Sequence, residues 1–195
     1  DDASLEYRGR REEAFYNRTH HSFIVGEVIA CAPLCPVMVL RVGYENPESW
    51  GNAIEYAVDH GAGVIVLPHG FISHGSGAPY PLFYMGTDFG YPVDNPKLRR
   101  SFDRAYEADC LICKGTADNR GRRVASAIVG HDAVLPIGSS NRRGEPADIC
   151  PSTDYALAAT PGGERGSDDE VDYIWSTGVD GAFVSFTGGC MASGF

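Results

Sequence analysis

Near its C-terminal end the chain reads Thr187-Gly188-Gly189-Cys190-Met191-Ala192-Ser193-Gly194. Two glycines precede a side chain that can act as a nucleophile, and small residues follow it. This composition favours a sharp turn that exposes backbone N–H groups and then begins a helix. A thiol at a helix N-terminus lies at the positive end of the helix dipole, which favours the thiolate. The run therefore indicates either a reactive cysteine or a plain buried thiol, and the rest of the chain must distinguish them.

The composition excludes several classes of function. With 195 residues, 43% apolar and 22% charged, the chain is long enough for one domain with a substantial core. Its net charge of −10 argues against a nucleic-acid partner, because phosphate binding requires clustered Lys and Arg. No run of about 18 apolar residues predicts a membrane span. We see neither a calcium-binding loop nor zinc-ligand spacing, and we expect no metal and no other cofactor.

The six cysteines are too few for a disulfide scaffold in a chain of this length. Cys31 and Cys35 flank a turn containing proline and are near enough in sequence to pair. Cys110 and Cys113 lie on an expected strand, where their spacing places them on opposite faces. We interpret the cysteines as reduced thiols, which favours, weakly, an intracellular location.

Apolar periodicity predicts alternating strands and helices. Asn46-Pro47-Glu48-Ser49 is a helix-start signal, and Trp50, Ala53, Ile54, Ala57 and Val58 follow it at helical spacing. A second helix is expected from Pro96 to Glu107, with Phe102, Ala105 and Tyr106 on one face. Strands are expected over Val37–Val42, Val64–Leu67, Asp109–Lys114, Ala133–Ile137, Tyr155–Ala159 and Ala182–Phe186, the first two as buried strands of a βαβ unit. The alternation indicates an α/β domain with helices packed on a mostly parallel sheet.

In parallel sheets the chemistry gathers at the carboxyl ends of the strands. Three such ends carry polar or nucleophilic groups in this sequence: Pro68-His69-Gly70, Lys114-Gly115-Thr116 and Thr187–Cys190. These three segments are therefore the candidate site.

In chain order, and over nearly the whole length, these pieces resemble the subtilisin-like peptidase family. The run around Cys190 resembles the family's Gly-Thr-Ser-Met-Ala motif, with cysteine at the position of the nucleophilic serine. His20-His21-Ser22-Phe23-Ile24-Val25-Gly26 resembles the helix start that carries the catalytic histidine, which corresponds to His20. Asp1-Asp2 resembles the motif whose first acid is catalytic.

The resemblance implies a three-layer fold with helices on both faces of the sheet and a peptide or protein substrate. It assigns Cys190 as the nucleophile, His20 as the base and Asp1 as the group that orients His20. Thr116 falls at the oxyanion asparagine, and Asn119 is a second candidate for that role. Substrate-pairing positions are implied at Leu67, Pro68, His69 and Gly70, and at Cys113, Lys114 and Gly115. Thr160-Pro161-Gly162 resembles the turn that precedes the nucleophile strand.

Two departures from the family pattern, at positions 190 and 194, bear on activity. Sulfur is larger than oxygen, so Cys190 would displace the attacking atom in a site shaped for serine. Gly194 replaces a proline, which would let the turn relax around the sulfur. A thioester prefers amines to water more than an oxygen ester does, so transfer of the acyl group to an amine, as in ligation or macrocyclisation, becomes an expected reaction beside hydrolysis.

The chain begins at the motif of Asp1 and extends only five residues past Cys190. We therefore expect residues 1–195 to be a single catalytic domain that is a segment of a longer polypeptide, with other segments of the same precursor completing its core. Two other functions stay open. An impaired relative would act as a peptide-binding or scaffolding module, which the threonine at position 116 favours. An unrelated α/β hydrolase with a Cys–His pair would carry its nucleophile after a different strand.

Overall fold

The structure, a computed structural model, describes residues 19–43, 46–68, 83–85, 95–116, 124–126, 131–148, 156–164 and 172–195. Residues 19–31 are helical, and three labelled helices follow: α2 (Pro47–Asp59), α3 (Pro96–Glu107) and the short α4 (Gly189–Ala192). The strands are β1 (Val64–Leu67), β2 (Phe83–Met85), β3 (Leu111–Gly115), β4 (Val124–Ser126), β5 (Val134–Ser140), β6 (Ala158–Pro161), β7 (Ile174–Thr177) and β8 (Phe183–Phe186). A 3-10 turn over Val179–Gly181 joins the last two strands.

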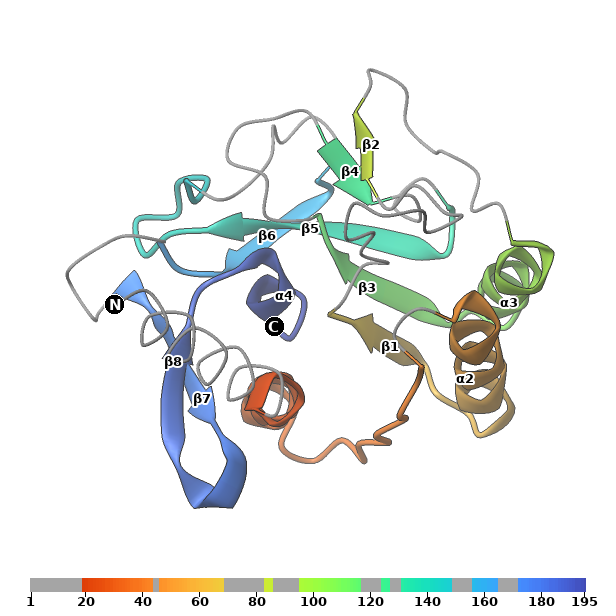
Figure 1. Cartoon of the computed structure of the whole chain (residues 1–195), viewed down its shortest axis with the longest axis horizontal. Coiled ribbons are helices and arrows are strands. Elements are labelled where there is room, and N and C mark those ends of the chain that lie inside the picture. The colour runs from red at the N-terminus through yellow and green to blue at the C-terminus, as the bar shows by residue number, and fades with distance from the viewer. Residues whose placement is uncertain are drawn as a thin grey trace, which may run out of the picture.

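A four-stranded parallel sheet with the order β1-β3-β5-β6 forms the centre of the molecule (Figure 1). Neighbouring residues of β1 face opposite layers. Leu67 and Ile65 pack in the core with α2 and α3, whereas Val66 packs with Phe23 of helix 19–31 and Met191 of α4. Helices therefore cover both faces of the sheet, which confirms the expected three-layer α/β architecture.

The two helices expected from the sequence form where their start signals predict. Asn46 caps α2, because its side chain accepts hydrogen bonds from the backbone N–H groups of Glu48 and Ser49 at 3.0 and 3.3 Å. Asn95 caps α3 in the same way, through Leu98 N at 2.9 Å. Proline at the first position of each helix supplies the fixed φ that a helix start needs.

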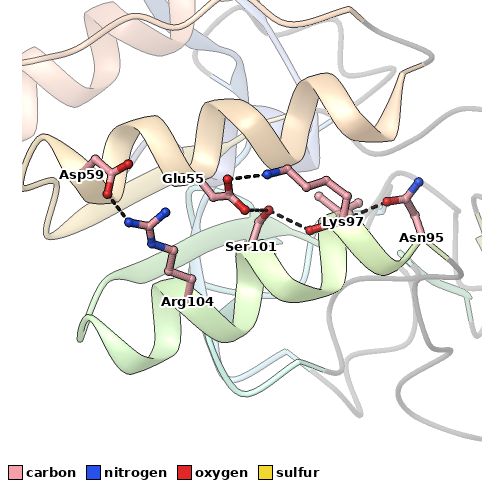
Figure 2. Close-up of polar contacts among 7 residues, drawn as sticks. Glu55, Asp59, Asn95, Lys97, Ser101 and Arg104 are labelled. Atoms are coloured by element: carbon pink, nitrogen blue, oxygen red, sulfur yellow. Dashed lines mark hydrogen bonds and ion pairs between the residues drawn. The ribbon is translucent and has the colours of Figure 1, made fainter.

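Helices α2 and α3 pack side by side along the sheet, and polar side chains tie them together (Figure 2). Lys97 of α3 forms an ion pair with Glu55 of α2, and Arg104 forms one with Asp59. Ser101 also donates to Glu55 at 3.2 Å. The apolar faces lie beneath these contacts, with Trp50, Ile54, Leu98, Phe102 and Ala105 all buried. The salt bridges therefore set the register of two helices that the core already holds.

Three expectations about the strands need correction. Residues 36–43 are extended but form no strand, and Val37, Met38 and Val39 are exposed, since no strand of the described part of the chain pairs with them. The first βαβ unit is consequently β1–α3–β3. β1 pairs with β3 alone among the described strands, which leaves Val64 58% exposed rather than buried.

The last apolar run is a strand outside the parallel sheet. β8 pairs antiparallel with β7, because the link between them is far too short for the crossover that parallel strands require.

Two smaller expectations concern single side chains. Cys31 and Cys35 are free, exposed thiols. Tyr106, expected on the buried face of α3, is 59% exposed in the last turn of that helix.

The α3 face offers a direct test of this core. Phe102→Ala should lower the free energy of unfolding by about 3–5 kcal/mol, because Phe102 is buried and its removal leaves a cavity. The matched control is Tyr106→Ala on the same helix, which should change it by less than about 0.5 kcal/mol. Urea unfolding followed by circular dichroism measures both, and equal losses in the two variants would contradict the assigned faces.

Candidate active site

The turn that carries Cys190 is held by one backbone and one side-chain hydrogen bond at the end of β6. β8 leads through Thr187 into Gly188, whose N–H donates to Gly162 O at 2.9 Å just after β6. α4 begins at Gly189, and it packs on β3, β5 and β6. Thr160 of β6 donates its hydroxyl hydrogen bond to the carbonyl of Ala192, near the end of α4. The turn is thus fixed at its entry and at its exit by the same strand, β6.

Gly115 at the carboxyl end of β3 touches the backbone of this turn. A methyl group added at Gly115 would lie 2.8 Å from the carbonyl carbon of Gly189 and 3.5 Å from Cys190 N, and closer still to Gly189 O. Only glycine fits such an approach without a shift of the backbone. The contact brings the segment Cys113–Thr116 beside the Cys190 turn, although β8, which leads into the turn, belongs to a different sheet from β3.

Helix 19–31, which carries His20, packs against the same turn from the other side. Phe23 and Ile24 form one buried cluster with Met191, and Cys190 packs on that cluster. His20 is fully buried near the start of the described helical residues. The elements that carry His20 and Cys190 are therefore packed together, and the hydrogen bond between the two side chains stays a prediction.

The β7–β8 hairpin fixes the position of helix 19–31. Ser176 donates to Phe23 O at 2.8 Å, and Thr177 donates to Ser22 O at 3.0 Å. Gly26 lies so close to both hydroxyls that an added methyl group would collide with them. The hairpin therefore locks the first turns of the helix, those that carry His20.

Thr116 lies at the end of β3 and is 1% exposed. Its backbone N–H donates to Ile137 O at 2.9 Å, and its hydroxyl has no hydrogen-bond partner among the described residues. A buried hydroxyl without a partner is destabilising unless a ligand or water satisfies it. This side chain is accordingly able to donate to a developing oxyanion, the role that the sequence predicts for it.

Lys114, an implied substrate-pairing position, offers no free strand edge. Lys114 pairs with Leu67 of β1 on one side and with Pro136 of β5 on the other, because β3 lies inside the sheet. Its buried ammonium group donates to Gly115 O at 2.8 Å. Leu67 and Lys114 form the last residue pair between β1 and β3, and Gly115 is the one residue of β3 that follows it.

The side chain of Leu67 belongs to the α2/α3 core, so a substrate would reach only its backbone. Pro68 follows β1 and is partly buried. Four predicted site residues lie outside the described residues: Asp1, His69, Gly70 and Asn119. Their roles stay predictions.

The cysteines differ in their surroundings. Burial raises the pKa of the thiols of Cys110 and Cys113, which disfavours their thiolates. Cys113 is therefore a poor competitor for the nucleophile's role, although it lies on the strand that touches the Cys190 turn. No group of side chains suited to hold a metal ion occurs in the described ranges. No helix within those ranges is long and apolar enough to cross a membrane.

Glu27 is a buried acid on helix 19–31 that the sequence analysis did not single out. It is 2% exposed, and neither carboxyl oxygen has a hydrogen-bond partner among the described residues. Desolvation raises its pKa from 4.5 to about 9, so the group is a neutral acid at neutral pH. The available signal was its spacing: Glu27 follows Phe23 by one helical turn, on the stripe that the apolar residues occupy.

Comparisons with known proteins place the fold. No family model matches the chain, and no curated protein matches its sequence. Among solved structures, a lanthipeptide protease gives a TM-score of 0.71 at 14% identity, covering 90% of this chain and 57% of that one. The epidermin leader peptide processing serine protease EpiP from Staphylococcus aureus gives 0.69 at 16% identity, covering 91% and 50%. The PatG macrocyclase in complex with peptide gives 0.55 at 17% identity, covering 76% and 38%.

These neighbours are subtilisin-like protease domains, and the chain has their fold. The likeness agrees with the resemblance of the motifs and disfavours an unrelated α/β hydrolase. At these identities the likeness concerns the fold alone. The chain spans about half of the length of the first two structures described, with 57% and 50% of them covered.

The raised pKa of Glu27 predicts how stability depends on pH. Between pH 4.5 and about 9 the folded protein retains a proton that the unfolded chain has lost, so stability falls as pH rises through this range. Glu27→Gln removes the titrating carboxyl group and therefore this dependence of stability on pH. The quantity to compare is the free energy of unfolding of the variant minus that of the wild type. We expect this difference to increase by on the order of 3 kcal/mol from pH 5 to pH 8. Urea unfolding at the two pH values measures it, and a difference that does not change with pH would refute the buried neutral acid.

The close approach at Gly115 predicts a local loss of function. Gly115→Ala should lower the rate of Cys190 alkylation by about 10-fold or more, because the added methyl group must displace the nucleophile turn. Gly63→Ala is the matched control, since a methyl group there meets no atom within 4 Å. Peptide mapping by mass spectrometry follows the alkylation, and equal rates in both variants would show that the turn is not packed on β3.

Proposed function

We propose that this chain is a subtilisin-like peptide-bond hydrolase or transpeptidase that acts through an acyl-enzyme on Cys190. The observation that carries the proposal is the packing of the Cys190 turn between Gly115 of β3 and the helix that bears His20. A nucleophile, a base and an oxyanion donor thereby come from three elements that touch one another. The order of the motifs along the chain supports the same assignment.

In the proposed reaction His20 takes the proton of the Cys190 thiol, and the sulfur attacks the carbonyl carbon of the scissile peptide bond. Asp1 holds the imidazole in the tautomer that accepts this proton. When the C–N bond breaks, His20 returns the proton to the leaving amine. The acyl group is then a thioester on Cys190, and water or a second amine releases it.

The negative charge that develops on the carbonyl oxygen needs donors placed in advance. The backbone N–H of Cys190 is one, and the buried hydroxyl of Thr116 is the proposed second, with Asn119 as the other candidate. Loss of one such donor commonly lowers the rate by about 10²–10³-fold. Replacing an amide by a shorter hydroxyl is thus compatible with activity but is expected to reduce it.

The proposed substrates are peptides cut or joined during the maturation of a longer precursor. Structural neighbours are named as a lanthipeptide protease, a leader peptide processing protease and a macrocyclase bound to peptide. The thioester on Cys190 favours an amine as the acceptor, so ligation or macrocyclisation is proposed beside hydrolysis.

A second candidate function is a peptide-binding module that retains the fold and has lost turnover. The position of Thr116 favours it, because a threonine hydroxyl reaches less far than the asparagine amide of the family pattern. Such a module would bind the same extended peptides without forming a lasting covalent bond to Cys190.

Intact mass spectrometry distinguishes the two. With a peptide thioester or a leader-containing peptide, the enzyme should gain the mass of the acyl group, and Cys190→Ala should abolish this adduct. Cys31→Ala is the control, because Cys31 is an exposed free thiol at the last residue of helix 19–31. Added amine should shift the products from acid to amide. Peptide binding with no adduct and no product would select the binding module.

A further inference from the structure

Glu27 is in close contact with Gly194, four residues after Cys190. A methyl group added at Gly194 would lie 3.0 Å from Cβ of Glu27 and 3.3 Å from its carboxyl carbon, and it would overlap Oε2. The carboxyl group therefore fills the volume that any side chain at position 194 would need. Gly194 is itself buried, so no solvent separates the two residues.

The contact joins the two segments that carry the proposed nucleophile and base. His20 and Glu27 are seven residues apart, which places them on one face of helix 19–31, two turns from each other. Cys190 and Gly194 are four residues apart, and the chain between them is helical, with Gly194 N donating to Met191 O at 3.0 Å. Phe23, Ile24 and Met191 pack between the two ends.

Two helical segments that touch at only one cluster can still change the angle between their axes. A second contact away from the cluster fixes the angle between them, because close-packed interiors resist such motion. The contact of Glu27 with Gly194 is such a contact, made directly between helix 19–31 and the segment that follows Cys190. Burying an acid without a hydrogen-bond partner opposes folding, so a purely apolar residue would pack here at lower cost.

We propose that Glu27 is a positioning residue for Cys190: its carboxyl group, packed on Gly194, sets where the nucleophile turn lies relative to the helix that bears His20. The proposal rests on the proposed function in taking Cys190 as the reactive thiol. Glu27 acts by its shape, so glutamine, which has the same shape, should position Cys190 equally well. A larger residue at position 194 should disrupt this positioning.

A double-mutant cycle on the full chain tests this. Gly194→Ala should slow the alkylation of Cys190 by iodoacetamide by about 10- to 100-fold and shift the pH profile of that reaction, because displacement of the sulfur by about 1 Å separates it from His20. Glu27→Ala should slow it less. The double variant should recover most of the rate, since it keeps only the Cβ contact at 3.0 Å. Glu27→Gln should react within about threefold of the wild type.

Alkylation of the exposed Cys31, measured in the same digests, controls for the reagent, and alkylation of the buried Cys110 reports global unfolding. Losses that simply multiply in the double variant would overturn the proposal, as would a slow Glu27→Gln enzyme. The acyl adduct is measured in parallel. Coupled alkylation rates without any acyl adduct would leave Glu27 as a positioning residue and refute the proposed function instead.

Discussion

The arrangement of the site depends on one steric constraint, the contact between the backbones of Gly115 and Gly189. Because no side chain fits at position 115, the end of β3 can lie directly against the turn that carries Cys190. Gly162 after β6 makes a similar approach, since a methyl group there would lie 2.9 Å from Gly188 O. Backbone packing at two strand ends therefore fixes one side of the turn that carries Cys190.

On the opposite side of the turn, side-chain contacts fix its position. The cluster of Phe23, Ile24 and Met191 draws helix 19–31 onto α4, and Ser176 fixes that helix through Phe23 O. Polar groups are buried in the segments that contact residues 189–194, among them Thr116, which follows Gly115, and Glu27, which contacts Gly194. Burying them opposes folding, and such groups concentrate where a protein gives up stability for chemistry. Their position beside Cys190 agrees with an active site.

Local patterns anticipated much of the fold. The apolar spacing after Asn46 and in residues 96–107 gave both long helices their limits, and the strands at β1, β3, β5 and β6 lie within a few residues of their expected positions. The pattern failed at residues 37–42, which form no strand, whereas the strand expected at residues 182–186 forms as β8. β8 lies outside the parallel sheet, because an apolar run does not specify which strand pairs with it. Glu27 escaped notice because a charged side chain is ordinarily read as solvent-facing.

The sequence by itself determined the helices, through caps and periodicity that act within a few residues, and it determined the order of the three motifs. The tertiary structure alone decided which strands pair, that Lys114 lies inside the sheet, and that Gly115 meets Gly189 and Glu27 meets Gly194. The physical reason is the range of the forces. Capping and helical spacing act between neighbours along the chain, whereas these contacts join residues 74 and 167 positions apart, and only close packing of the whole domain brings them together.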